Sequence, residues 1–92
     1  DGSQKWVSKI GLQVFPNPSH GTPTIEFYLP LKGEVSLSVT NLSGQEMIRL
    51  IDHEILEGNQ ELKLPAGNFA AGIYYCILQN GDQKLVQKFT IL

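Results

Sequence analysis

The sequence is poor in the residues from which disulfides, metal centres and catalytic sites are built. It has one cysteine, Cys76, and two histidines, His20 and His53. A single cysteine excludes a disulfide within the chain. Residues 73–78, which include Cys76, are otherwise aliphatic or aromatic, and this setting predicts a buried thiol that packs as a small hydrophobic side chain. A reactive or metal-binding thiol would need a more polar surrounding.

Charge of either sign is also scarce. Charged residues make up 17% of the chain and the net charge is −2, whereas about 25% is usual for soluble domains. The seven lysines and arginines are scattered singly, so no basic patch is available to neutralise nucleic-acid phosphates. We therefore expect no nucleic acid among the partners of this protein.

Long hydrophobic runs are missing too. No run approaches the roughly 18 apolar residues of a membrane-spanning helix, so we expect no transmembrane segment. The first five residues, Asp-Gly-Ser-Gln-Lys, lack the apolar stretch of a signal peptide. We interpret the chain as a piece of a longer protein, with residues 1–9 as a linker from a preceding domain, residues 10–92 as one folded domain and Leu92 as a natural C-terminus.

The residue clusters that enzymes use are not recognisable. His20 and His53 fall in predicted loops, and neither has a carboxylate or thiol at a familiar metal-ligand spacing. Asp52 and Glu54 flank His53, but neighbours in an extended segment point to opposite sides. The acidic residues are isolated, whereas a calcium loop needs several carboxylates together. We expect a domain that is not an enzyme and has no cofactor or metal.

What the sequence does contain is alternation of apolar and polar residues, which is typical of half-buried β-strands. Turn-forming prolines, glycines and asparagines separate the alternating runs. Seven strands are predicted, at residues 10–14, 24–29, 35–40, 46–51, 62–64, 73–79 and 84–92. Short strands at this spacing favour an all-β fold, a seven-stranded antiparallel immunoglobulin-like β-sandwich. Residues 52–58 are predicted to form a helical turn or a loop.

The alternation also predicts which side chains face inward. The predicted core consists of Ile25, Phe27, Leu37, Val39, Leu64, Tyr74, Cys76, Leu78 and Phe89. In the last strand, Phe89 and Ile91 should face the core while Lys88, Thr90 and Leu92 face away.

The turns follow known local preferences. Pro16 and Pro18 end the first strand because proline has no N–H to donate to a ladder, and Gly21 is predicted to supply a positive φ in the same loop. Asn41 to Gly44 form a second turn. Asn80-Gly81 is the favoured pair for a two-residue hairpin.

The order of these segments resembles the C-terminal sorting domains of the type IX (Por) secretion system, type A. The run Val-Phe-Pro-Asn-Pro-Ser-His-Gly at residues 14–21 is similar to the "YPNP…G" opening of that family, with Phe15 in place of Tyr. Strand 35–40 and the following Asn-Leu-Ser-Gly-Gln resemble an alternating strand followed by "D-x-x-G-[RK]". Asn41 and Gln45 replace the charged residues of that pattern, so we assign this turn no ionic role.

The second half of the chain continues the resemblance. Glu-Gly-Asn at residues 57–59 looks like the "aG.n" element, and Leu-Lys-Leu at 62–64 like the strand after it. Phe-Ala-Ala-Gly-Ile-Tyr at 69–74 resembles "L-a-x-G-[VI]-Y", and Lys-Phe-Thr-Ile-Leu at 88–92 is similar to the closing strand. The resemblance covers residues 10–92.

This resemblance implies a carrier function in a Gram-negative bacterium. Such a domain directs an attached cargo from the periplasm across the outer membrane to the cell surface or the medium. Its implied partners are an outer-membrane translocon, a shuttle protein and a sortase-like cysteine protease, which cuts upstream of Ile10 so that the cargo is anchored or released. We expect the domain itself to be monomeric.

Recognition would use loops and an edge strand whose backbone groups remain free to pair with a partner. The candidate residues are Pro16, Asn17, Pro18, Gly21, Gly44, Gly72, Tyr74, Lys88, Thr90, Ile91 and Leu92. For the glycines and Tyr74, turn geometry and core packing are the favoured explanations. For Lys88 and the last three residues, recognition and simple closure of the sheet are equally supported.

The alternative is an accessory carbohydrate-binding or adhesive module of a secreted protein. Tyr28 and Tyr75 are predicted to face outward or towards a second covering layer, and Trp6 lies in the linker. Exposed aromatic rings can stack on sugars, although cross-strand packing on a pleated surface is the favoured explanation for Tyr75.

Isothermal titration calorimetry with Zn²⁺ or Ca²⁺ tests the expected absence of a metal site. We expect no stoichiometric binding to the whole chain, because no ligand cluster would offset the cost of desolvating and ordering the ligands. A dissociation constant below about 10 μM for either ion would contradict this expectation.

Overall fold

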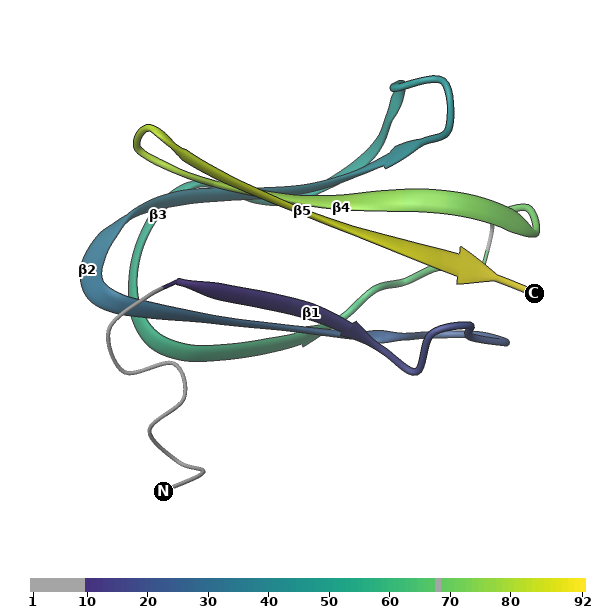
Figure 1. The fold of residues 1–92 in the computed structure, drawn as a ribbon, viewed down its shortest axis with the longest axis horizontal. Helices are drawn as coiled ribbons and strands as arrows, with labels where there is room; N and C mark the ends of the chain where they lie inside the picture. Colours follow the sequence, from purple (N-terminus) through teal and green to yellow (C-terminus); the bar gives the residue numbers. More distant parts are fainter. Residues whose placement is uncertain (1–9, 68) are drawn as a thin grey trace.

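The computed structural model describes residues 10–67 and 69–92, which fold as a curled antiparallel sheet (Figure 1). Its strands are β1 (Gly11–Phe15), β2 (Thr24–Asn41), β3 (Glu46–Lys63), β4 (Gly72–Asn80) and β5 (Gln83–Ile91). The sheet order is β1-β2-β4-β5, with β3 also paired to β2. No helix in this part of the chain is long and apolar enough to cross a membrane. The predicted linker, residues 1–9, lies outside the described residues.

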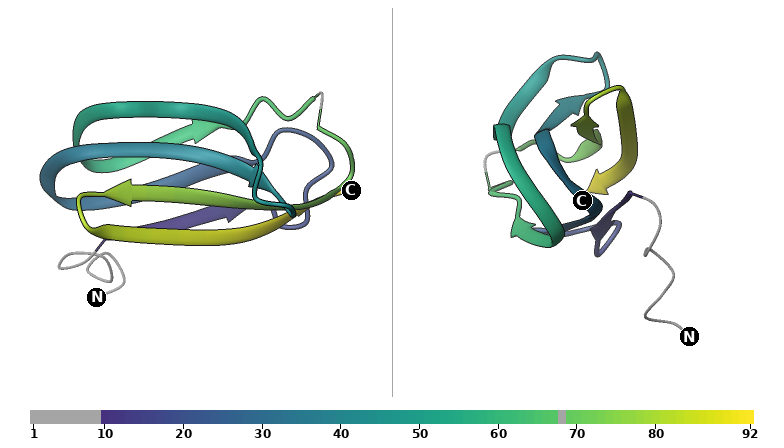
Figure 2. Two further views of the ribbon diagram at one scale, coloured as in Figure 1. Left: turned by 90° about the horizontal axis from the view of Figure 1, so that it is seen from above. Right: turned by 90° about the vertical axis from the view of Figure 1, so that its left-hand side faces the viewer.

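Strands β2 and β3 are long and bent, and each contributes to both layers of the domain (Figures 1 and 2). The first part of β2, residues 24–29, pairs with β1 and with residues 58–63 of β3. Its second part pairs with residues 46–56 of β3 and with β4. The sheet therefore folds over on itself, and the side chains between its two layers form the core.

The prediction of an all-β antiparallel fold is confirmed, but the prediction of seven separate strands is corrected. The described residues form five strands, because two predicted breaks are bends inside β2 and β3. Pro30 lies in the register shift between Leu29 and Gly33, where its missing N–H costs no ladder hydrogen bond. Residues 52–58, predicted as a helical turn or loop, belong to β3. The immunoglobulin-like arrangement of seven strands is thus not confirmed.

The predicted core is confirmed: every residue assigned to it is buried. Its largest fully buried side chains include Phe27 and Phe89, which come from β2 and β5. Phe89 and Ile91 face inward while Lys88 and Leu92 are exposed, as the alternation predicts. Thr90 is half-buried.

The cysteine is also placed as predicted. Cys76 is a free, buried thiol in β4. Desolvation raises the pKa of its thiol to about 12, so the side chain stays protonated at neutral pH and is unsuited to nucleophilic or redox chemistry.

Tyr74 joins the core to the corner that precedes β4. Its ring centroid lies 5.9 Å from that of Phe89 and 5.1 Å from that of Phe69. Its hydroxyl donates a hydrogen bond to the carbonyl of Ala70, at 2.5 Å. The ring and the hydroxyl thus hold the corner against the end of β5.

We expect Tyr74→Ala to lower the free energy of unfolding by about 3–5 kcal/mol, because it removes a buried aromatic ring and leaves a cavity. The matched control is Tyr75→Ala, the next residue of the same strand, which faces outward and should cost less. Both values come from denaturant titrations followed by circular dichroism. A loss below about 1 kcal/mol for Tyr74→Ala would show that its ring is not part of the core.

Candidate recognition site

The predicted recognition residues lie at one end of the domain (Figure 1). This end, which we call the distal end, consists of loop 16–21, turn 41–45, corner 70–74 and residues 88–92. The strand register brings these segments together, because Tyr74 pairs with Asn41 and Ile91 pairs with Gly72 and bridges to Ser19. The start of β1 and the turn between β4 and β5 lie at the opposite end.

Loop 16–21 is held against the end of β5 by the side chain of Asn17. Its Nδ2 donates to the carbonyl of Lys88 at 3.1 Å, and its Oδ1 accepts from the N–H of Thr90 at 3.0 Å. One amide therefore contacts the backbone of β5 as a peptide group of a neighbouring strand would.

Ser19 continues this contact through its backbone. Its N–H donates to the carbonyl of Thr90 at 2.9 Å, and its carbonyl accepts from the N–H of Leu92 at 2.8 Å. Its side chain is buried, with 3% of the residue exposed, and its Oγ accepts from the N–H of Gly21 at 3.3 Å. Ser19 was not among the residues predicted from the sequence, because a serine in a polar loop carries no signal of such a contact.

The prolines and glycines of the distal end differ from one another. Pro16 and Pro18 are exposed, and both follow cis peptide bonds. The prediction that Gly21 supplies a positive φ is wrong, since this glycine is absent from the positive-φ residues of the described chain. Gly44, by contrast, has a φ of 89°, a value that favours glycine.

The turn that contains Gly44 is organised by Asn41. Its Oδ1 accepts from the N–H groups of Ser43 and Gln45 at 3.0 and 2.9 Å. Its Nδ2 donates to Oε1 of Gln45 at 3.2 Å. An amide pair thus joins the two positions at which the sequence departs from the charged pattern, and no ionic contact is needed to form the turn.

The side chains of the distal end offer partly apolar surface. Leu92 is 55% exposed, and Phe15 and Leu42 are also exposed at this end. Lys88 is exposed on the outer side of β5. Tyr74 and Ile91 are buried, so the side chains of these two candidates offer little surface to a partner.

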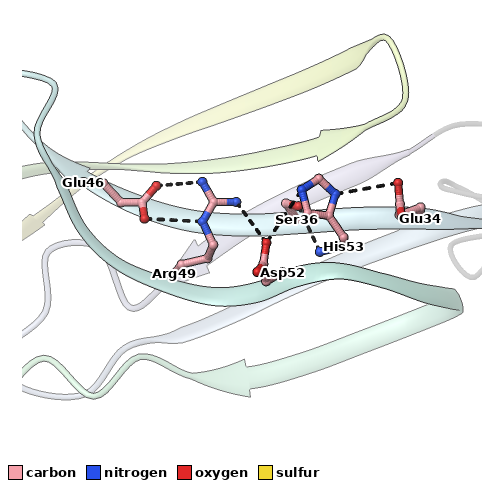
Figure 3. Close-up of polar contacts among 6 residues, drawn as sticks. All are labelled: Glu34, Ser36, Glu46, Arg49, Asp52 and His53. Carbon is pink, nitrogen blue, oxygen red and sulfur yellow. Dashed lines mark hydrogen bonds and ion pairs between the residues drawn. The ribbon is translucent and has the colours of Figure 1, made fainter.

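A separate row of charged residues runs along β3, and sequence reasoning missed it (Figure 3). Nη2 of Arg49 lies 2.8 Å from Oε1 of Glu46, and its Nη1 lies 3.8 Å from Oδ1 of Asp52. The hydrogen bond with Glu46 raises the pKa of Arg49. All of these side chains are exposed, so the pairs contribute little to stability.

His53 closes this row, and its position corrects an expectation. Its ring nitrogens lie 3.7 Å from carboxylate oxygens of Asp52 and of Glu34, whereas Asp52 and His53 were expected to point apart. The register shifts between Val35 and Leu37; this bulge turns both side chains outward. His53 has a φ of 55°.

Beside this row, the outer face of the sheet forms an open polar hollow of about 400 Å³. Its lining includes Ser36, Ser38 and Thr40 of β2, between Arg49 of β3 and Ile77 of β4. Among the described residues, no group of three or more His, Cys, Asp and Glu side chains could hold a metal ion. The hollow therefore offers hydroxyls and charged side chains of both signs, but no recognisable catalytic set.

The residues considered for other functions are not brought together. His20 lies in the loop of the distal end, whereas His53 neighbours the bend of β3 at the other end. Tyr28 belongs to the part of β2 that pairs with β1, and Tyr75 lies in β4 between Thr40 and Lys88. These two tyrosines therefore lie on different layers. Trp6 is outside the described residues.

Comparison with known proteins points to one family. The family model described as "Secretion system C-terminal sorting domain" matches residues 13–92. None of the curated proteins compared matches the chain. A solved structure of PorZ, an essential bacterial surface component of the type-IX secretion system of Porphyromonas gingivalis, shares the fold with a TM-score of 0.64 and 18% identity. The likeness covers 89% of this chain and 11% of that one, so the chain spans about a tenth of its structural neighbour.

Two glycines of the distal end can be distinguished by substitution. We expect Gly44→Ala to lower the free energy of unfolding by about 1 kcal/mol or more, because alanine is strained at a positive φ. Gly21→Ala is the control, and it should change stability by less than about 0.5 kcal/mol, since an added Cβ would meet nothing within 4 Å. Equal effects of the two substitutions in denaturant titrations would contradict the difference in backbone conformation.

Proposed function

Because the chain belongs to the family of type IX secretion system C-terminal sorting domains, we propose that it carries an attached cargo protein across the outer membrane. In this proposal the distal end binds the outer-membrane translocon and its shuttle protein. A sortase-like cysteine protease then cuts the chain upstream of Ile10, and the cargo is anchored at the cell surface or released. The domain is a ligand and a substrate of this machinery and catalyses nothing itself.

The single observation that carries this proposal is the gathering of the candidate residues at the distal end. Segments that lie up to 73 residues apart in the sequence are joined there by hydrogen bonds. A signal shared by different cargoes must have a shape that does not depend on the cargo. The buried core of this domain, built from its own strands, supplies such a shape.

The place where β1 begins supports the same proposal. Strand β1 starts at the end of the domain opposite to the distal end (Figure 1). A cargo joined ahead of β1 would therefore leave the distal end accessible. The receptor could hold one end of the domain while the protease acts near the other.

Export of a reporter tests this function. We expect the full chain, fused behind a periplasmic reporter in a host with a type IX system, to bring the reporter to the cell surface. Deletion of Thr90, Ile91 and Leu92 should trap it in the periplasm. Because Ile91 is buried, the deletion also removes core contacts, so a point variant is needed.

Leu92→Asp and Val86→Asp form a matched pair, since the two residues are 55% and 54% exposed on or next to the same strand. We expect Leu92→Asp to block export, with an unchanged circular dichroism spectrum, and Val86→Asp to be exported normally. Normal export of Leu92→Asp would exclude the last residues as a recognition element.

If even the unmodified fusion stays in the periplasm, the sorting function is wrong. The alternative, an accessory carbohydrate-binding module, would then gain support from millimolar or tighter binding to a polysaccharide. That binding should be lost in Tyr75→Ala or Tyr28→Ala. The placement of these two tyrosines on different layers leaves this alternative without a shared stacking platform.

A further inference from the structure

Near the end of β5, the edge that faces away from β4 is hydrogen-bonded to loop 16–21. On one side, β5 pairs with β4 in continuous register from Gln83 to Ile91. Alternate residues of a strand direct their backbone groups to opposite edges, so Lys88, Thr90 and Leu92 present theirs to the side away from β4. Loop 16–21 occupies that side through Asn17 and Ser19.

Four backbone groups at this edge have hydrogen-bond partners. The carbonyl of Lys88 accepts from Nδ2 of Asn17 and also from Nε2 of Gln87, at 3.1 and 2.9 Å. A carbonyl has two acceptor sites, so both are used. The N–H and carbonyl of Thr90 and the N–H of Leu92 are bonded to the loop as well.

This closure corrects the expectation that the final edge strand offers free backbone groups to a partner. A partner that adds a strand needs a row of unpaired N–H and carbonyl groups. Residues 88–92 provide no such row while the loop is in place. The groups that remain available at this position include outward side chains, among them those of Lys88 and Leu92.

We propose that Asn17 is a positioning residue whose amide, together with the backbone of Ser19, closes the terminal edge of β5. The export machinery then recognises residues 88–92 and loop 16–21 as one folded surface, through side chains rather than by strand addition. This inference rests on the sorting function proposed above. It adds the way in which the export machinery binds the distal end.

Asparagine suits this role because its planar side chain carries one acceptor and one donor group in the arrangement of a peptide unit. Aspartate has almost the same shape but lacks the N–H₂ donor. In Asn17→Asp a carboxylate would face the carbonyl of Lys88, and that repulsion should open the edge. We therefore expect Asn17→Asp to be as damaging as Asn17→Ala.

Amide hydrogen exchange measured by NMR on the full chain tests the closure without any export assay. We expect Asn17→Ala and Asn17→Asp to speed exchange at the N–H of Thr90 about five-fold or more, the factor that one net hydrogen bond supplies. The control is Asn80→Ala, which removes a similar bond, from Nδ2 to the carbonyl of Glu34 at 3.1 Å, and should leave Thr90 unchanged. A Thr90 amide that exchanges equally fast in all four proteins would overturn the closure.

Export of the same variants tests whether the export machinery needs the closed edge of β5. With Asn17→Ala or Asn17→Asp we expect surface delivery of the reporter to fall about ten-fold, and with Asn80→Ala to stay normal. Lys88→Glu should also reduce export while the Thr90 amide remains protected, whereas Lys84→Glu, on the same strand, should not. If the partner instead bound β5 by adding a strand to it, Asn17→Ala should improve export and Lys88→Glu should have no effect.

The outcomes separate this inference from the sorting function. Suppose that Asn17→Ala exposes the Thr90 amide and the fusion is still exported normally, while the Leu92→Asp fusion is not. Residues 88–92 are then a signal, and the positioning role of Asn17 is wrong. If the unmodified fusion is not exported, the sorting function fails, and recognition by the export machinery fails with it.

Discussion

The pairing of β2 with three other strands is the constraint on which the rest of the domain depends. Its first part lies between β1 and the end of β3, and its second part lies between the start of β3 and β4. Inward side chains such as Phe27 and Leu37 are fully buried on the two parts. Because β2 bends between Leu29 and Gly33, this one strand contributes to both layers of the sheet. Each layer covers the apolar face of the other.

The distal end follows from this arrangement. Strands β1 and β5 both finish at this end, and β4 begins there (Figure 1). The loop after β1 is consequently carried to the edge of β5, where Asn17 and Ser19 bond to its backbone. Loop 16–21 and residues 88–92 are thus parts of one surface.

Much of the fold could be predicted from the sequence, because alternation is a local property. It correctly placed the buried Tyr74 and Cys76, and the inward and outward sides of β5. It failed where local patterns mislead. Pro30 looks like the end of a strand but lies in a bend, and the bulge at Asp52 and His53 changes which side chains face outward. The bend and the bulge can be predicted only when the pairing of β2 with β3 is known.

The contacts that build the candidate site could not be predicted from the sequence, and neither could the part that Ser19 plays in them. The resemblance to a family selected Asn17 and Lys88, but nothing in either segment indicated that they touch, since 71 residues separate them. Hydrogen bonds between a side-chain amide and a distant backbone have no periodic signature. The charged row from Glu46 to His53 was missed for a related reason, because a bulge rather than a motif assembles it.

Site-specific photo-crosslinking during export tests most directly whether the distal end is the surface that the machinery contacts. A photoreactive phenylalanine analogue would replace His20 or Leu92 at the distal end, or Leu31, which is 79% exposed in the bend of β2. We predict adducts with outer-membrane proteins from the two distal positions and none from Leu31. Adducts from Leu31 alone would contradict the account.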